Sequence, residues 1–122
     1  MKVSNSKIII NSDETEIIRL IKSPNNLEKF HPFCKKNKVE VWNKEKSIDF
    51  VEYHNNKIYK RKFIDWGDNG YNLDIYEKRK LANISWNVVK ISNNKSSLII
   101  TAVPHLPFKY KIINQLIFKL YV

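Results

Sequence analysis

Residues 71–103 read YNLDIYEKRKLANISWNVVKISNNKSSLIITAV, and their pattern is the strongest indication of the fold in this chain. Apolar and polar side chains alternate here in two runs, whose apolar members are Tyr71, Leu73 and Ile75, and then Ile84, Trp86 and Val88. A period of two is typical of a strand that buries one face. The connections are too short for crossover helices, so consecutive strands are expected to be antiparallel.

The same reasoning, extended in both directions, predicts a seven-stranded antiparallel sheet. The expected strands cover 3–11, 38–42, 47–54, 57–66, 71–78, 81–92 and 96–103. Asn55-Asn56 favours a two-residue hairpin turn, because asparagine tolerates a positive φ better than most residues. Charges fall on both faces of the earlier strands, so their orientation stays open.

Helices are expected at two places. Asp13 with Glu16 forms a capping box that begins a short helix, and Ser23-Pro24 favours the start of a second one that ends near His31-Pro32. Residues 108–122 return to helical spacing. Their apolar stripe is Tyr110, Ile113, Leu116, Ile117, Leu120 and Tyr121. A curled sheet must bury one face, and this last helix is its expected partner, giving an α+β fold.

Composition limits the class of protein. The chain has 122 residues, 43% of them hydrophobic, which suits one globular domain over 1–122. Its single cysteine excludes a disulfide framework and fits a reducing compartment. No apolar run is long enough to span a membrane, and no secretory signal is recognisable at the start. A cytoplasmic location is expected.

The charge is strongly positive but unevenly placed. The net charge is +10, and residues 78–122 contain 8 basic residues and no acidic one. Such an excess raises nucleic acid or an anionic membrane as partners. The lysines alternate with apolar residues and form no arginine-rich track, so nucleic-acid binding ranks last among the functions considered.

Three segments resemble the SRPBCC superfamily, the helix-grip fold of START lipid-transfer domains and polyketide cyclase/dehydrase proteins. They are the opening strand leading into 13–18, the segment 26–34 (NLEKFHPFC), and the ending 103–108 (VPHLPF). The resemblance implies a sheet curled around a C-terminal helix, with a cavity for a small hydrophobic molecule between them. Here the chain ends at Val122, so that helix is expected to be short.

The aromatic residues of the central strands suit both a packed core and a cavity wall. Trp86 is the foremost wall candidate, because Ile84 and Val88 flank it in clean alternation. By the resemblance, His31 lies near the cavity mouth, although capping of the short helix is the favoured role for it. The residues expected to bind ligand are His31, Phe33, Phe50, Tyr59, Phe63, Leu73, Ile75, Ile84, Trp86, Val88, Ile99, Val103, Tyr110 and Ile113.

Catalysis and metal binding find less support. His31-x-x-Cys34 has the spacing of half a zinc site, but a second ligand pair is missing, so neither a metal nor a cofactor is expected. No nucleophile elbow is present, and the only glycines are Gly67 and Gly70, which excludes a phosphate-cradling loop. The candidates for acid–base work are Asp49, Glu52, Asp65, Asp74 and the tyrosines.

Binding of a small hydrophobic molecule or lipid is therefore the expected function. A cyclase or dehydratase activity in the same cavity is the alternative, and the sequence leaves open whether any reaction is catalysed. The third reading is contact of the basic C-terminal region with nucleic acid or an anionic membrane. A short last helix would expose apolar surface that favours a homodimer. Lys109, Lys111 and Lys119 would instead favour the membrane.

Overall fold

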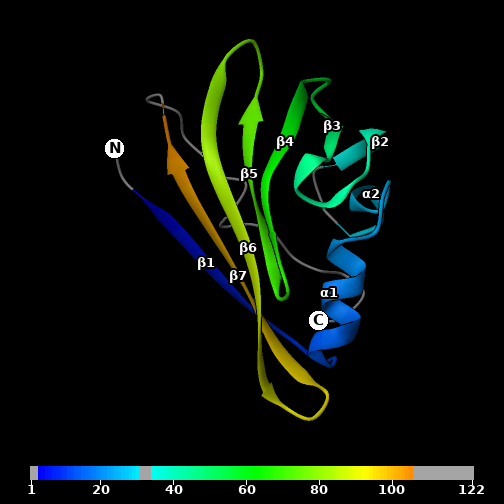
Figure 1. Cartoon of the computed structure of the whole chain (residues 1–122), viewed down its shortest axis with the longest axis vertical. Coiled ribbons are helices and arrows are strands. Elements are labelled where there is room, and N and C mark those ends of the chain that lie inside the picture. Colours follow the sequence, from blue (N-terminus) through cyan, green and yellow to red (C-terminus); the bar gives the residue numbers. More distant parts are fainter. Residues whose placement is uncertain (1–2, 31–33, 106–122) are drawn as a thin grey trace.

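The protein folds around one sheet, shown in Figure 1. The structure is a computed structural model that describes residues 3–30 and 34–105. Its elements, in chain order, are β1 (Ser4–Ile10), α1 (Glu14–Ile21), α2 (Leu27–Phe30), β2 (Cys34–Val41), the 3₁₀ turn η1 (Lys44–Lys46), β3 (Ile48–Tyr53), β4 (Ile58–Gly67), β5 (Gly70–Tyr76), β6 (Lys80–Ser92) and β7 (Lys95–Pro104). The predicted helix over 108–122 lies outside the described residues.

The seven strands form a single antiparallel sheet in the order β1-β7-β6-β5-β4-β3-β2. Every pair of neighbours from β2 to β7 is a hairpin, and β1 closes onto β7 as the last strand of the row. The sheet is curled and unclosed, with β1 and β2 at its edges (Figure 1). The predicted α+β class and the seven-stranded antiparallel sheet are confirmed.

The sheet has an inner face, which α1 covers, and an outer face. Tyr71 lies opposite Trp86 in the register, and Trp86 lies opposite Ile100, so all three point to the same face. The Tyr71 hydroxyl donates a hydrogen bond of 3.1 Å to the Ile21 carbonyl at the end of α1, which identifies that face as the inner one. The core is built on it, because Leu73, Leu98, Ile100 and Ala102 are fully buried.

The first helix begins as predicted, and the second does not. Asp13 caps α1 by accepting a hydrogen bond of 2.9 Å from the Glu16 backbone N–H. Ser23 was expected to cap the second helix, but its hydroxyl donates to the Arg19 carbonyl at 2.6 Å, back toward α1. Asn25 then takes a positive φ of 57°, which no α-helix continues through, so α2 begins only at Leu27.

Two further details differ from the sequence predictions. The Tyr53 N–H donates to the Lys57 carbonyl, so these two residues still pair and the loop between them has three residues, 54–56. Within this loop, Asn56 alone takes a positive φ, of 68°. Three-residue loops of this kind end on a left-handed residue, which asparagine fills well. Strand β2 begins at Cys34, whereas the sequence predicts a start at Lys38. The four residues in between, 34–37, include two lysines and an asparagine.

Strand β2 is an edge strand whose free side is covered by the preceding segment. The backbone N–H of Asn37 donates to the Glu28 carboxylate at 3.1 Å, and that of Val39 donates to the Asn25 side-chain oxygen at 3.0 Å. In return, Asn37 accepts from the Leu27 N–H at 3.2 Å. Covering an edge in this way prevents further strands from pairing with it. No helix among the described residues has the length and apolarity to cross a membrane.

Candidate functional site

Aromatic rings form a continuous chain across the inner face. Trp86 contacts Tyr71 at 5.8 Å between ring centroids, Tyr71 contacts Phe63 at 4.9 Å, and Phe63 contacts Trp42 at 5.4 Å. Trp66 touches three of these rings, those of Trp42, Phe63 and Tyr71, at 5.4 to 5.5 Å. Tilted and edge-to-face contacts at these distances are the favourable ones. The inner face thus carries a connected cluster of buried and partly buried aromatic rings that extends from β6 to Trp42, the residue after β2.

The end of α1 is fixed to this aromatic chain. The Trp42 indole N–H donates to the Lys22 carbonyl at 3.1 Å, beside the bond from Tyr71 to Ile21. The Lys22 ammonium lies 5.3 Å from the centre of the Trp66 ring, within reach of a cation–π contact. Burial lowers the pKa of Lys22, against the attraction of Asp68. The position of α1 over the sheet is therefore set by aromatic side chains with polar tips.

A buried ion pair lies on the same face, where β3 and β4 meet. Arg61 donates from Nε to Asp49 Oδ1 at 2.7 Å and from Nη2 to Oδ2 at 2.6 Å. The Asp49 side chain is fully buried and that of Arg61 is 7% exposed. Asn37 of β2 donates a third hydrogen bond to Asp49 Oδ2, at 2.9 Å. These three hydrogen bonds come from β2 and β4, the two strands that flank β3, so the carboxylate is held from both sides.

The protonation of the surrounding groups follows from burial. Burial raises the pKa of Tyr71 to about 12, although the charge of Arg61 and its hydrogen bond act in the opposite direction. Burial also acts to lower the pKa of Arg61, but the attraction and hydrogen bond of Asp49 outweigh it and the net direction is upward. The Cys34 thiol is buried and its pKa is raised to about 12, chiefly by desolvation. Tyr71 and Cys34 therefore keep their protons at neutral pH.

The predicted ligand-binding residues divide by face. Half of them are brought together on the inner face, namely Tyr59, Phe63, Leu73, Ile75, Ile84, Trp86 and Val88. Three others point to the outer face, namely Phe50, Ile99 and Val103. Side chains alternate along a strand, and each of these lies next to a residue of the inner face. Four lie outside the described residues: His31, Phe33, Tyr110 and Ile113.

Among the four carboxylates considered for acid–base work, Asp49 is the one on the inner face. Glu52 pairs with Ile58 across the β3–β4 register and so points outward. Asp74 also points outward, where Lys80 approaches it to 3.2 Å and Asn83 donates to it at 3.0 Å. Asp65, at the bulge of β4, is exposed and accepts from the Trp66 N–H.

The sequence reasoning missed Arg61 and Asn37. Arg61 could have been found from the length of the loop before β4. A three-residue loop at 54–56 places residue 61 opposite residue 49. The predicted two-residue turn would have placed residue 62 there instead. No comparable signal exists for Asn37, since its role depends on how β2 pairs with β3.

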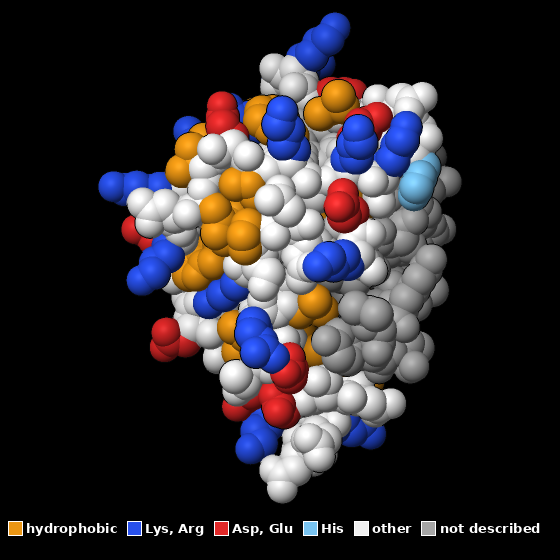
Figure 2. Space-filling view, turned by 90° about the vertical axis from the view of Figure 1, so that its right-hand side faces the viewer, with side chains coloured by type: hydrophobic (Ala, Val, Ile, Leu, Met, Phe, Trp, Pro, Cys, Tyr) orange, Lys and Arg blue, Asp and Glu red, His pale blue; other side chains and the backbone are white. Residues whose placement is uncertain are grey.

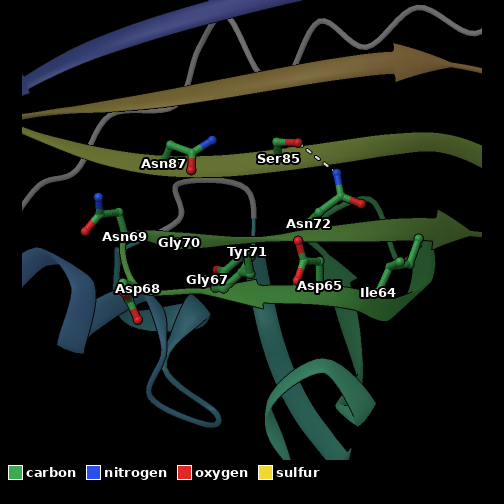
Figure 3. Close-up of a pocket in the computed structure, with 10 residues that line it drawn as sticks. All are labelled: Ile64, Asp65, Gly67, Asp68, Asn69, Gly70, Tyr71, Asn72, Ser85 and Asn87. Atoms are coloured by element: carbon green, nitrogen blue, oxygen red, sulfur yellow. Dashed lines mark hydrogen bonds between the residues drawn. The ribbon is translucent and has the colours of Figure 1, made fainter.

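A polar hollow of about 640 Å³ lies on the outer face around the β4–β5 turn (Figure 3). Asn72 points toward Ser85 and donates to its hydroxyl at 2.8 Å (Figure 3). Asn72 and Asn83 exchange two further hydrogen bonds of 2.8 Å. The side-chain amides of this hollow therefore satisfy one another, and so polar a hollow does not suit an apolar ligand.

Comparisons with known proteins identify the fold. No family model and no curated protein matches the chain. Among solved structures, the protein XoxI from Bacillus cereus aligns with a TM-score of 0.76 at 13% identity, over 94% of this chain and 84% of that one. A START superfamily protein from Mycobacterium smegmatis gives 0.69 at 10% identity, over 93% and 85% of the two chains.

An enzyme shares the same architecture. The Zhui aromatase/cyclase from Streptomyces sp. R1128 aligns with a TM-score of 0.73 at 6% identity, over 88% of this chain and 70% of that one. Identities this low establish the fold and not the activity. The curled antiparallel sheet with its two short helices after the first strand therefore has the same fold as these START-superfamily and aromatase/cyclase structures.

Proposed function

We propose that this protein binds a small hydrophobic molecule against the inner face of its sheet. The carrying observation is the aromatic chain from Trp86 through Tyr71 and Phe63 to Trp42, which is continuous, apolar and confined to that face. Binding sites for small molecules are lined by apolar and aromatic side chains with a few fixed polar groups. Tyr71 and the Asp49–Arg61 pair would be those polar groups. The neighbouring folds, START proteins among them, support this class of function.

The polar groups favour binding over proton transfer. Asp49 accepts from Arg61 twice and from Asn37 once, so its oxygens are committed to fixed donors. The Tyr71 hydroxyl, with a pKa raised to about 12, holds its proton at neutral pH. A general acid or base works best with a pKa near the working pH. Groups with fixed partners and fixed protonation suit a binding site better than proton transfer.

Native mass spectrometry of protein purified from expressing cells tests the proposal. The expected result is a mass excess that disappears on denaturation, with an apolar compound in the organic extract. A chain that carries no compound, and that also shows no mass shift with fatty acids, sterols or polycyclic aromatic compounds, would contradict it.

A cyclase-like reaction is the second candidate, and the presence of an aromatase/cyclase among the structural neighbours is what favours it. Incubation with a poly-β-ketone thioester would then yield a cyclised product that has lost water. Turnover reduced at least tenfold in Tyr71→Phe would support a role for that hydroxyl. Ligand retention without any product would leave binding as the function.

A further inference from the structure

The outer face of strands β2, β3 and β4 carries a groove with lysines around an apolar floor. The groove has a volume of about 530 Å³ and is lined by Lys36 and Lys38 of β2, Phe50 and Glu52 of β3, and Ile58 of β4. The Ile58 side chain is 55% exposed, the largest value among the exposed hydrophobic residues of the described part of the chain. This surface lies on the side of the sheet opposite the proposed ligand.

The strand register places the lysines on both sides of the apolar groups. Lys38 lies directly opposite Phe50, and Phe50 lies directly opposite Lys60, so one row runs lysine, phenylalanine, lysine. Directly opposed residues have Cβ atoms about 5 Å apart, which puts both lysine stems beside the ring. In the neighbouring rows of the same face, Lys36 lies two positions from Lys38, and Lys62 lies two positions from Lys60.

Positive charge exceeds negative charge on this surface. Its outward positions hold Lys36, Lys38, Lys60 and Lys62 against Glu52, whose carboxylate lies 3.8 Å from the ammonium of Lys35, and against the exposed Glu40 at the bulge of β2. Asp74, the outward neighbour of Lys62 on β5, is bonded to Lys80. The lysines of the groove therefore remain available to an external anion.

The combination of charges and apolar groups selects among partners. An added peptide strand is disfavoured, because side chains of Glu28 and Asn25 already occupy the edge N–H groups of β2. A nucleic acid would satisfy the lysines but would set phosphates against Ile58 and Phe50. The boundary of an anionic bilayer offers phosphates for the lysines and acyl chains for the apolar residues in one plane.

We propose that the outer face of β2–β4 docks onto an anionic lipid membrane, with Ile58 and Phe50 at the acyl boundary and the four lysines at the level of the phosphates. Figure 2 views the molecule from the side that carries β2 and the two helices, where hydrophobic side chains gather in groups with lysine and arginine side chains beside them. The docking surface and the proposed ligand face are opposite sides of the sheet, so each can be tested without the other.

Removal of charge is the first test. Binding of the full chain to vesicles of phosphatidylcholine with phosphatidylserine is compared for Lys38→Gln/Lys60→Gln and for Lys90→Gln/Lys95→Gln. The control pair is exposed and removes the same charge near the β6–β7 turn. A lysine near an anionic surface contributes a factor of about 5, so the first pair should weaken partitioning roughly 25-fold. The control should change it less than threefold.

Three outcomes would overturn the proposal. The first is that the chain does not bind anionic vesicles. The second is that both double variants lose vesicle binding to the same extent. The third is that the chain binds duplex DNA or RNA more tightly than vesicles, and that Lys38→Gln/Lys60→Gln weakens this binding as much.

Insertion of a reporter is the second test. Ile58→Trp and Val89→Trp each place an indole at an exposed position of the outer face, 55% and 47% exposed in the parent chain, on β4 and β6. Brominated lipids quench an indole that reaches the acyl boundary. After subtraction of the parent signal, Ile58→Trp should be quenched at least threefold more than Val89→Trp. Equal quenching, or stronger quenching at residue 89, would contradict docking through β2–β4.

Discussion

Arg61 and Asp49 meet through two hydrogen bonds of 2.6 and 2.7 Å on the inner face of the sheet, beside a core that is mainly aliphatic and aromatic. The pair lies next to the aromatic chain, since the Arg61 guanidinium is 5.2 Å from the centre of the Phe63 ring. A buried ion pair of this kind contributes little net stability but fixes the strands that hold it. Its removal tests how tightly the inner face is organised.

Breaking the pair from one side should be severely destabilising. Asp49→Ala leaves the buried Arg61 without its counter-charge, and we expect a loss of about 3 to 5 kcal/mol in the free energy of unfolding, measured by urea denaturation. Replacing both residues, as in Asp49→Leu/Arg61→Met, should recover most of that loss. Glu52→Gln, which breaks only the exposed contact with Lys35, should cost about 1 kcal/mol or less. A loss below about 1 kcal/mol for Asp49→Ala would contradict the buried pair.

Tyr71 should make the protein sensitive to alkaline pH. Its pKa is about 12 in the folded state, against an ordinary value of 10.0, so the unfolded chain releases this proton first as pH rises. Stability is unaffected by this group below pH 10 and falls between pH 10 and 12, on the order of 2 to 3 kcal/mol. Tyr71→Phe should flatten this part of the curve of unfolding free energy against pH. An equally steep fall in the variant would assign the alkaline loss to other groups.

Gly70 should tolerate no side chain. A Cβ at this position would lie 1.7 Å from the Trp86 carbonyl oxygen on the adjacent strand, which is backbone and has no freedom to yield. Gly70→Ala should lower the free energy of unfolding by more than about 2 kcal/mol, seen in thermal denaturation. Gly67→Ala is the matched control, because its Cβ would meet nothing nearer than the Gly70 carbonyl at 4.0 Å. Equal stability of the two variants would refute the close approach of β5 and β6.

The sheet was predictable because its signal is local. The alternation of Tyr71, Leu73 and Ile75 is enough to place β5, and the resulting face is the one observed. The start of β2 was missed because Cys34 to Asn37 has a composition that favours exposure, and only pairing with β3 makes it a strand. The second helix was placed too early because Ser23-Pro24 is a good start signal locally, whereas the chain turns at Asn25.

The candidate site was less predictable, because it depends on register. A loop of two or three residues at 54–56 decides whether residue 61 or residue 62 faces Asp49, and both are basic. Phe50 is among the predicted ligand-binding residues, but β3 buries the alternate positions Asp49, Val51 and Tyr53 instead. A hydrophobic side chain on a strand with charges on both faces carries no signal of its orientation.

Titration with the neutral apolar probe N-phenyl-1-naphthylamine, followed by energy transfer from tryptophan, tests the proposed ligand face most directly. Trp86 is buried at the centre of that face, in contact with Tyr71, whereas Trp42 stands at the far end of the aromatic chain. We predict saturable binding by the parent chain, with more than half of the energy transfer lost in Trp86→Phe and a smaller loss in Trp42→Phe, both variants retaining the parent circular dichroism spectrum. The absence of saturable binding, or transfer that survives intact in Trp86→Phe, would contradict the inner face as the ligand site.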